Sequence, residues 1–136
     1  MKKSLKRILM IEDEADIRTV ATMALQAVGG FEVQACASGA EGLAAAPTAN
    51  ADLVLLDVMM PGMDGPATLA GLRLIPATSQ TPVIFMTAKV QPREVDAYIA
   101  LGAVGVIPKP FDPMDVSNEI RRIWDRQSEP AGPSAA

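Results

Sequence analysis

The sequence predicts an α/β fold built on a parallel sheet. Short apolar runs alternate with helix-like segments five times along the 136 residues, which is the order produced by right-handed β-α-β units. One of these runs, Leu53 to Leu56, is apolar at every position, as is typical of a parallel strand that helices cover on both faces. Nearly half of the residues (49%) are hydrophobic, which is enough to build one core. We therefore expect a single domain over residues 1–127, followed by a small, Pro-rich and polar tail, 128–136, that is disordered.

Five strands follow from the apolar runs, and the second of them sets their expected order. Residues 31–36 alternate apolar and polar side chains, which indicates a less buried strand at the edge of the sheet. An edge position for this strand favours the order 2-1-3-4-5 of a flavodoxin-like sheet with helices on both faces, in which the chain changes direction between strands 1 and 3. The five predicted strands are residues 7–11, 31–36, 53–56, 82–86 and 104–107.

Helical periodicity is clearest near the two ends of the chain. Apolar residues recur at helical spacing over 17–28, and two glycines then end that helix. The last helix has its pattern over 116–124, and Asp112-Pro113 can begin it with a cap and a proline in the first turn. We expect Trp124 in this helix to pack in the core. Weaker helical patterns cover residues 40–46, 64–74 and 92–101.

Charge and composition exclude several classes of function. The formal net charge of −4 argues against a general nucleic-acid binder, which needs a basic face. No apolar stretch is long enough for a signal-peptide core or a membrane span. The chain has no His and only Cys36 as a thiol, so it cannot form an internal disulfide, a Cys-His metal site or a phosphohistidine of its own. We expect a cytoplasmic protein with no direct nucleic-acid partner and no membrane partner, and we expect Cys36 to fill the core.

Chemically reactive side chains follow four of the predicted strands. Asp57 closes the strand 53–56 and leads directly into a turn. An Asp in this place is most often a turn former or a helix cap. However, the carboxyl ends of parallel strands meet at one edge of the sheet, where ligands bind. The other three strand ends carry Glu12-Asp13, Thr87 and Lys109, which brings three carboxylates, a hydroxyl and an ammonium to that edge.

This combination of groups predicts phosphoryl transfer. Three carboxylates suit a hard divalent cation such as Mg²⁺, which prefers oxygen ligands. The cation and Lys109 can neutralise charge on a transferring phosphoryl group, and Asp57 would be the nucleophile. Each residue also has an ordinary interpretation, since the acidic pair can cap a helix, Thr87 can favour a strand and Lys109 can be a solvated loop charge. Those interpretations do not explain why all of these groups converge on one edge.

Five short motifs mark this edge in order: Glu12-Asp13, Asp57 with Met60-Pro61, Met63-Asp64-Gly65, Thr87-Ala88 and Lys109-Pro110-Phe111. Together they resemble the receiver domain of two-component response regulators, over about Lys6 to Arg126. The resemblance implies that Asp57 accepts a phosphoryl group from a sensor histidine kinase or a histidine phosphotransfer protein and forms an aspartyl phosphate. It implies that phosphorylation switches the binding of a downstream protein, and that the chain is not an enzyme beyond promoting its own phosphorylation and dephosphorylation. No output domain follows the motifs, so we expect a stand-alone receiver.

The resemblance also assigns the metal ligands. Asp13, Asp57 and the backbone carbonyl of Met59 would bind Mg²⁺ (or Mn²⁺), and Glu12 would reach the ion through water. The methionine side chains in the loop after Asp57 have no metal role, because copper-type sites need ligands such as His. We expect these side chains to pack in the loop: Met59, Met60 and Met63.

By the same resemblance, Lys109 would pair with the phosphoryl oxygens and Thr87 would donate a hydrogen bond to one of them. The Lys109–Pro110 peptide would be cis. The chain departs from the family pattern at Val106, where receivers commonly carry Tyr or Phe, and this departure puts the usual aromatic switch in question. Two further positions flank the path of the water that hydrolyses the aspartyl phosphate in related receivers, and here they are Met59 and Lys89.

Three other functions compete with a phosphorylated receiver. A haloacid-dehalogenase-like phosphohydrolase also uses an Asp nucleophile and Mg²⁺, but it needs a second Asp where this chain has Met59. A nucleotide-binding module would need a Walker A or a Gly-x-Gly-x-x-Gly motif, and neither is present. A receiver-like interaction module that works without phosphorylation stays open, although all of the chemical positions are filled.

Overall fold

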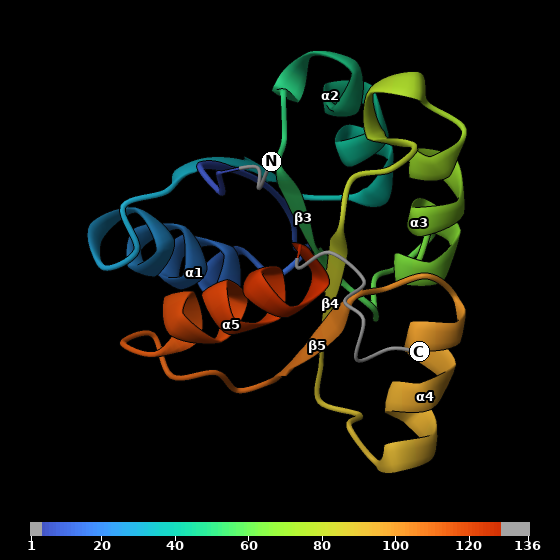
Figure 1. The fold of residues 1–136 in the computed structure, drawn as a ribbon. Helices are drawn as coiled ribbons and strands as arrows, with labels where there is room; N and C mark the ends of the chain where they lie inside the picture. Colours follow the sequence, from blue (N-terminus) through green and yellow to red (C-terminus); the bar gives the residue numbers. More distant parts are fainter. Residues whose placement is uncertain (1–3, 129–136) are drawn as a thin grey trace, which may run out of the picture.

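Helices cover both faces of a five-stranded parallel sheet in the computed structural model, which describes residues 4–128 (Figure 1). The strand order is β2-β1-β3-β4-β5, and every neighbouring pair is parallel. This order confirms the predicted fold class and the edge position of the second strand. The last helix includes Ser128, which the sequence assigned to the tail. The rest of the predicted tail, 129–136, lies outside the described residues, as do residues 1–3.

Strands and helices alternate along the described chain, and the predicted strands and weaker helices all occur near their expected positions. Among residues 4–128, no helix is long and apolar enough to cross a membrane. The strands are β1 (Arg7–Ile11), β2 (Glu32–Cys36), β3 (Leu53–Asp57), β4 (Val83–Thr87) and β5 (Gly105–Pro108). The helices are α1 (Ala15–Ala27), α2 (Gly39–Ala49), α3 (Gly65–Arg73), α4 (Pro92–Ala100) and α5 (Val116–Ser128), with a 3₁₀ turn η1 at Pro76–Thr78.

Helix α2 continues past a proline that lies just beyond its predicted end. The predicted helix stopped at residue 46, but α2 includes Pro47 and ends at Ala49. Proline in a helix removes one backbone donor and crowds the preceding turn, so it usually breaks the helix. Here Ala46 is buried and holds this turn against the sheet. The chain leaves the helix only at Asn50, which adopts the left-handed conformation with φ of 52°.

Helix α5 begins later than predicted. Asp112 and Pro113 form a separate turn instead of the helix start, since α5 begins at Val116. The Asp112 side chain accepts the N–H of Met114 at 2.9 Å, and its carbonyl accepts the N–H groups of Asp115 and Val116. These hydrogen bonds to Asp112 form one turn that precedes the helix. The proline therefore lies in this turn and not in the first turn of α5.

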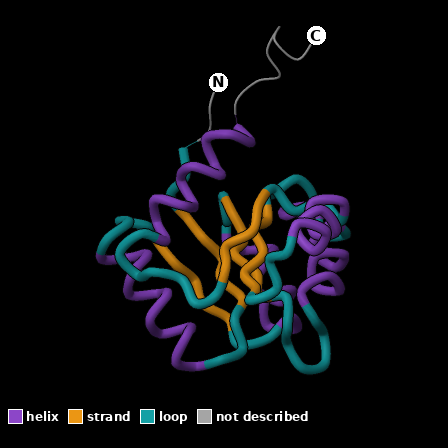
Figure 2. Tube along the Cα trace, turned by 90° about the horizontal axis from the view of Figure 1, so that it is seen from below, coloured by secondary structure: helices purple, strands orange, loops and turns teal. Residues whose placement is uncertain are grey.

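Alternate residues of the strands face two hydrophobic layers, one on each side of the sheet. Figure 2 shows the strands enclosed between the helices on both sides. One layer packs β1, β3 and β4 against α1 and α5 and includes Trp124, whereas the other packs the opposite strand faces against α2 and α3 and includes Cys36. Both side chains are buried, as expected. Burial on both faces makes the central strands apolar throughout, and it leaves the strand ends as the place for polar chemistry.

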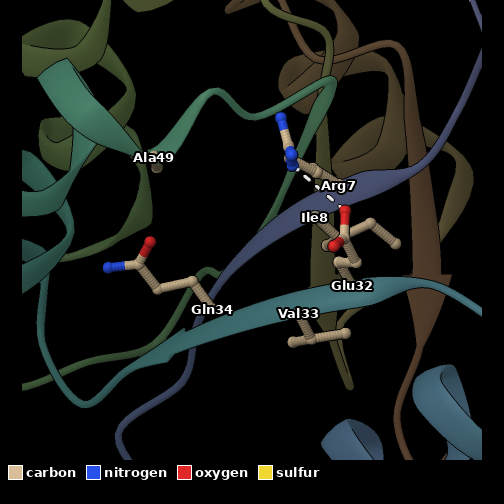
Figure 3. A pocket seen from close by; sticks show the side chains of 6 residues that line it. All are labelled: Arg7, Ile8, Glu32, Val33, Gln34 and Ala49. Carbon is tan, nitrogen blue, oxygen red and sulfur yellow. Dashed lines mark hydrogen bonds and ion pairs between the residues drawn. The ribbon is translucent and has the colours of Figure 1, made fainter.

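Strand β2 forms the exposed edge of the sheet and lines a shallow pocket there (Figure 3). Arg7 and Glu32 are opposite each other in the β1–β2 register, and Arg7 Nε lies 3.1 Å from Glu32 Oε2. Both side chains are more than half exposed, so this ion pair contributes little to stability. Because both residues begin their strands, this pocket lies toward the amino ends of the strands, away from the reactive groups that follow the carboxyl ends.

Candidate functional site

The strand register brings the predicted site residues together at the carboxyl edge of the sheet. Ile11 is paired with Leu56, so Glu12 falls beside Asp57 in the next step of the register. Thr87 ends β4 and is paired with Pro108, so Lys109 follows directly at the neighbouring strand end. The expectation that four strand ends meet at one edge is therefore confirmed.

Three carboxylates form the centre of this site. Glu12, Asp13 and Asp57 each place an oxygen within 4.8 Å of the other two. Glu12 and Asp57 are buried, with 0% and 2% of their surface exposed. The ammonium of Lys109 lies 2.9 Å from Asp57 Oδ1 and 2.7 Å from Glu12 Oε1. One ammonium therefore faces three carboxylates, and the cluster keeps an excess of negative charge.

Burial, together with this excess charge, shifts the pKa values of the site. Burial raises the pKa of Asp57 to about 7, and the neighbouring Glu12 and Asp13 add to the rise, although Lys109 opposes it. Burial alone would lower the pKa of Lys109, but its hydrogen bonds and charge interactions with Glu12 and Asp57 outweigh burial and raise that pKa. Lys109 therefore remains an ammonium, while Asp57 is costly to ionise in the absence of another cation.

The residues present fit a divalent cation. Asp13 Oδ1 is buried and has no hydrogen-bond partner among residues 4–128. A buried polar atom without a partner is unfavourable, so its position is best explained by a ligand. Carboxylate oxygens are the ligands that Mg²⁺ prefers, and three of them converge here. The cluster could therefore hold a metal ion, and Lys109 already contacts one oxygen of Glu12 and one of Asp57.

Thr87 lies at the edge of this site but makes a local bond. Its buried hydroxyl accepts a hydrogen bond from the backbone N–H of Lys89 at 3.0 Å. Its carbonyl accepts the backbone N–H of Lys109 at 2.9 Å. No hydrogen bond within residues 4–128 uses the hydroxyl proton of Thr87, so a role toward a phosphoryl oxygen stays a prediction that the geometry allows. The predicted cis peptide between Lys109 and Pro110 is present.

The loop after Asp57 is held by a close approach of its backbone. A Cβ atom added to Gly65 would lie 2.7 Å from the carbonyl oxygen of Asp57, so only glycine fits there. The Asp64 side chain caps α3 by accepting the N–H of Ala67 at 2.9 Å, which keeps this carboxylate out of the cluster. This turn fixes the direction in which Asp57 leaves the sheet.

The expectation that the loop methionines pack was wrong for Met59. Met60 is buried and Met63 is half-buried, but 60% of Met59 is exposed. The three residues have the same side chain, and only the turn decides which of them faces inward. The proposed metal contact of Met59 involves its backbone carbonyl, so an outward side chain does not affect that prediction.

Sequence reasoning missed one residue of the site, Arg18. Its Nη1 donates to the carbonyl of Glu12 at 2.9 Å and to the carbonyl of Asp13 at 3.2 Å. The signal was present, because a basic residue one turn into the helix after an acidic pair can reach back over that pair. The apolar periodicity of the same helix indicates only the face that packs on the sheet, and Arg18 is not part of that pattern.

Comparison with known proteins identifies the family. The family model of the response regulator receiver domain matches residues 8–121, which is most of the chain. This chain belongs to the response regulator receiver family. The sequence prediction of a receiver is thereby confirmed, and the α/β order of the sheet agrees with it.

Three relatives illustrate the match. The DNA-binding response regulator MtrA of Mycolicibacterium paratuberculosis is 34% identical over 127 residues, which are 93% of this chain and 55% of MtrA. This receiver therefore spans about half the length of that relative. The chemotaxis protein CheY4 of Vibrio cholerae superposes with a TM-score of 0.81 at 31% identity, covering 88% of this chain and 99% of CheY4. The receiver domain of a sensor histidine kinase from Pseudomonas aeruginosa PAO1, with a magnesium ion coordinated in its active site cleft, gives a TM-score of 0.75 at 25% identity, covering 90% of this chain and 97% of that domain.

Proposed function

We propose that this receiver accepts a phosphoryl group on Asp57 from a phosphohistidine of a partner protein, in a reaction that depends on Mg²⁺. The observation that carries this proposal is the cluster of buried Glu12 and Asp57 with half-buried Asp13, in which Lys109 contacts Asp57 Oδ1. The donor is a histidine kinase or a histidine phosphotransfer protein, since this chain has no His. The phosphorylated form then changes which downstream protein it binds. The chain catalyses only its own phosphorylation and dephosphorylation.

The side chains of the site have separate tasks in this reaction. A carboxylate oxygen of Asp57 forms the new bond to phosphorus while the P–N bond of the donor breaks and its electron pair returns to the imidazole. Lys109, which contacts Asp57 already, neutralises charge on the phosphoryl oxygens as they arrive. When bound, Mg²⁺ supplies further positive charge for those oxygens. Asp13, Asp57 and the backbone carbonyl of Met59 would hold the ion, and Glu12 would reach it through water. The Thr87 hydroxyl would donate to one phosphoryl oxygen.

The decisive experiment is phosphorylation of the purified protein by acetyl phosphate. We expect intact mass spectrometry to detect one added phosphoryl group in the presence of Mg²⁺, and much less with EDTA. Asp57→Asn should remove the signal, because the amide has no anionic oxygen to attack phosphorus. Asp64→Asn is the matched control: Asp64 only caps a helix, where Asn serves equally well.

Two outcomes would contradict this assignment. Stoichiometric phosphorylation of another carboxylate in the wild type would show that Asp57 is not the phosphoacceptor. A wild type that stays unmodified with acetyl phosphate and with a panel of phosphorylated histidine phosphotransfer proteins would favour the interaction module that works without phosphorylation.

Mg²⁺ is expected to raise the melting temperature of the wild type, because a ligand that binds only the native state stabilises it by mass action. At a concentration of 100 Kd the gain is about 2.7 kcal/mol, which corresponds to roughly 5–10 °C. Asp13→Asn should show a much smaller shift, since it replaces the carboxylate whose Oδ1 has no partner within the described chain. Differential scanning calorimetry with and without Mg²⁺ measures this. Equal shifts in the two proteins would count against a metal site at Asp13.

Phosphorylation is expected to change the surface formed by α4, β5 and α5. Thr87 connects the site to this surface, because its hydroxyl holds the N–H of Lys89 and its carbonyl holds the N–H of Lys109. Val106 lacks the large swing of an aromatic side chain, so we expect backbone movement near Ala88 to carry the change. Amide hydrogen exchange of the free and beryllofluoride-bound protein should differ most on this surface. A response confined to α2 and α3 would refute the proposal.

A further inference from the structure

Arg18 contacts the acidic cluster from its backbone side. The residue lies one turn into α1, and side chains on a helix point back toward its amino terminus. Its guanidinium therefore reaches over the first turn, where Nη1 donates to the consecutive carbonyls of Glu12 and Asp13 at 2.9 and 3.2 Å. One nitrogen thus fixes two adjacent peptides of the loop that joins β1 to α1.

The contacts of Arg18 leave the carboxylates free. No ion pair within residues 4–128 joins Arg18 to an acidic side chain. An arginine that paired directly with Asp13 would compete with a metal ion for the same oxygens. By binding carbonyls, Arg18 instead places a positive charge close to the cluster without occupying a carboxylate oxygen. Asp13 Oδ1 has no hydrogen-bond partner within residues 4–128.

Glu12 and Asp13 differ in what else holds them. The backbone N–H of Glu12 donates to the carbonyl of Cys36 at 3.0 Å, its Oε2 accepts the N–H of Glu14, and its Oε1 lies against Lys109. Asp13 lies one residue farther from the sheet, and its Oδ1 makes no bond that would orient it within the described chain. Because Glu12 is held by these other contacts, its orientation depends little on Arg18. The orientation of Asp13 depends more strongly on the hydrogen bond from Arg18 to its carbonyl.

We infer that Arg18 is a positioning residue for the metal site: it holds the Asp13 peptide so that Oδ1 faces Glu12 and Asp57, and it offsets part of their mutual repulsion. The inference rests on the Mg²⁺ site of the proposed function. Groups that orient metal ligands without touching the metal commonly change its affinity by about 10- to 100-fold. Arg18 acts through Asp13 and through the local field, and it makes no contact with the phosphoryl group.

Isothermal titration of the intact chain with Mg²⁺ tests this directly. Arg18→Met keeps the apolar stem but removes the charge and both hydrogen bonds. We expect it to raise the Kd for Mg²⁺ by about tenfold. At limiting Mg²⁺, acetyl phosphate should phosphorylate the variant more slowly than the wild type. At saturating Mg²⁺ the two rates of phosphorylation should be equal, because a high Mg²⁺ concentration compensates for the lower affinity. A destabilised control variant separates this dependence from a general loss of stability.

Arg73→Met is the matched control. Arg73 Nη1 also donates to two backbone carbonyls, those of Thr78 and Thr81, at 3.0 and 2.6 Å. These bonds lie before β4 begins, at the opposite edge of the sheet from the acidic cluster. The control variant removes the same kind of interaction, so it should lower the melting temperature and leave the Kd for Mg²⁺ unchanged.

The outcomes separate this inference from the proposed function. An unchanged Kd in Arg18→Met, or an equal increase in Arg73→Met, would overturn the positioning role. A wild type that binds Mg²⁺ but is not phosphorylated would overturn the proposed function alone, and a wild type that does not bind Mg²⁺ would overturn both. If Arg18→Met does not fold, Arg18→Leu, which also removes the charge and both hydrogen bonds, is measured in the same way, and an unchanged Kd again refutes the role.

Discussion

Asp57→Asn is expected to stabilise the metal-free protein by about 4 kcal/mol at pH 8. In the wild type, burial and the neighbouring carboxylates raise the pKa of Asp57 from 3.8 to about 7. This difference corresponds to about 4 kcal/mol, at 1.36 kcal/mol for each pH unit. Asparagine has nearly the same shape and carries no charge, so it fills the site without the cost of burying a third carboxylate beside Lys109.

The sign of the pH dependence follows from the protons that each state binds. Between pH 3.8 and about 7, Asp57 is protonated in the native state and ionised in the unfolded state. The raised pKa of Asp57 therefore contributes fully to the free energy of unfolding below pH 3.8, and this contribution is lost as the pH rises to about 7. The advantage of Asp57→Asn should be near zero at pH 4 and reach its full value at pH 8.

Urea unfolding at pH 4, 6 and 8 in EDTA measures this difference, with the buried Trp124 as the fluorescent probe. Asp64→Asn serves as the control, because it makes the same substitution at a helix cap outside the cluster. Mg²⁺ should reduce the advantage of Asp57→Asn at pH 8, since the ion stabilises the wild type, with all three carboxylates, more than it stabilises the variant. If Asp57→Asn is no more stable than the wild type at pH 8, ionised Asp57 does not destabilise the metal-free protein, and the prediction is wrong.

The fold and the outline of the site were predictable because they depend on patterns that are local in sequence. Fully apolar runs identified the buried strands, and the alternating run at 31–36 identified the edge strand β2. Parallel topology then placed Asp57 and Lys109 at one edge, and the structure brings them to 2.9 Å. These steps need only the period of the side chains and the rule for parallel sheets.

The features that were missed depend on contacts between distant residues or on a balance of small energies. No pattern near Pro47 reveals that burial of Ala46 will carry α2 through the proline. Nor does spacing tell whether Lys109 will meet one carboxylate or two, and the 2.7 Å contact with Glu12 was not foreseen. Arg18 was not singled out from the sequence, because its hydrogen bonds to the carbonyls of Glu12 and Asp13 depend on the direction of the preceding loop.

The aspartyl phosphate of this receiver is expected to decay slowly. The two residues that flank the path of the attacking water in related receivers are Met59 and Lys89. Both side chains are exposed at the rim of the site, and the backbone N–H of Lys89 is bonded to the Thr87 hydroxyl. A thioether is a weak acceptor and a lysine carries an ammonium at neutral pH, so neither can take the proton of a water molecule. The attacking water therefore has no general base at these two positions. On the side of Met59 it must also pass an apolar side chain.

Met59→Asn with Lys89→Glu supplies what the wild type lacks, since the amide can orient the water and the carboxylate can accept its proton. General-base assistance is typically worth about 10²–10⁴ in rate, so even an imperfectly placed pair should accelerate decay at least about tenfold. The measurement is the loss of phosphoprotein in Mg²⁺ after removal of acetyl phosphate, followed by intact mass. Met23→Asn, which replaces a methionine of similar exposure on α1, should decay like the wild type. A wild type that loses its phosphoryl group as fast as the double variant would mean that hydrolysis here is controlled by something other than these two side chains.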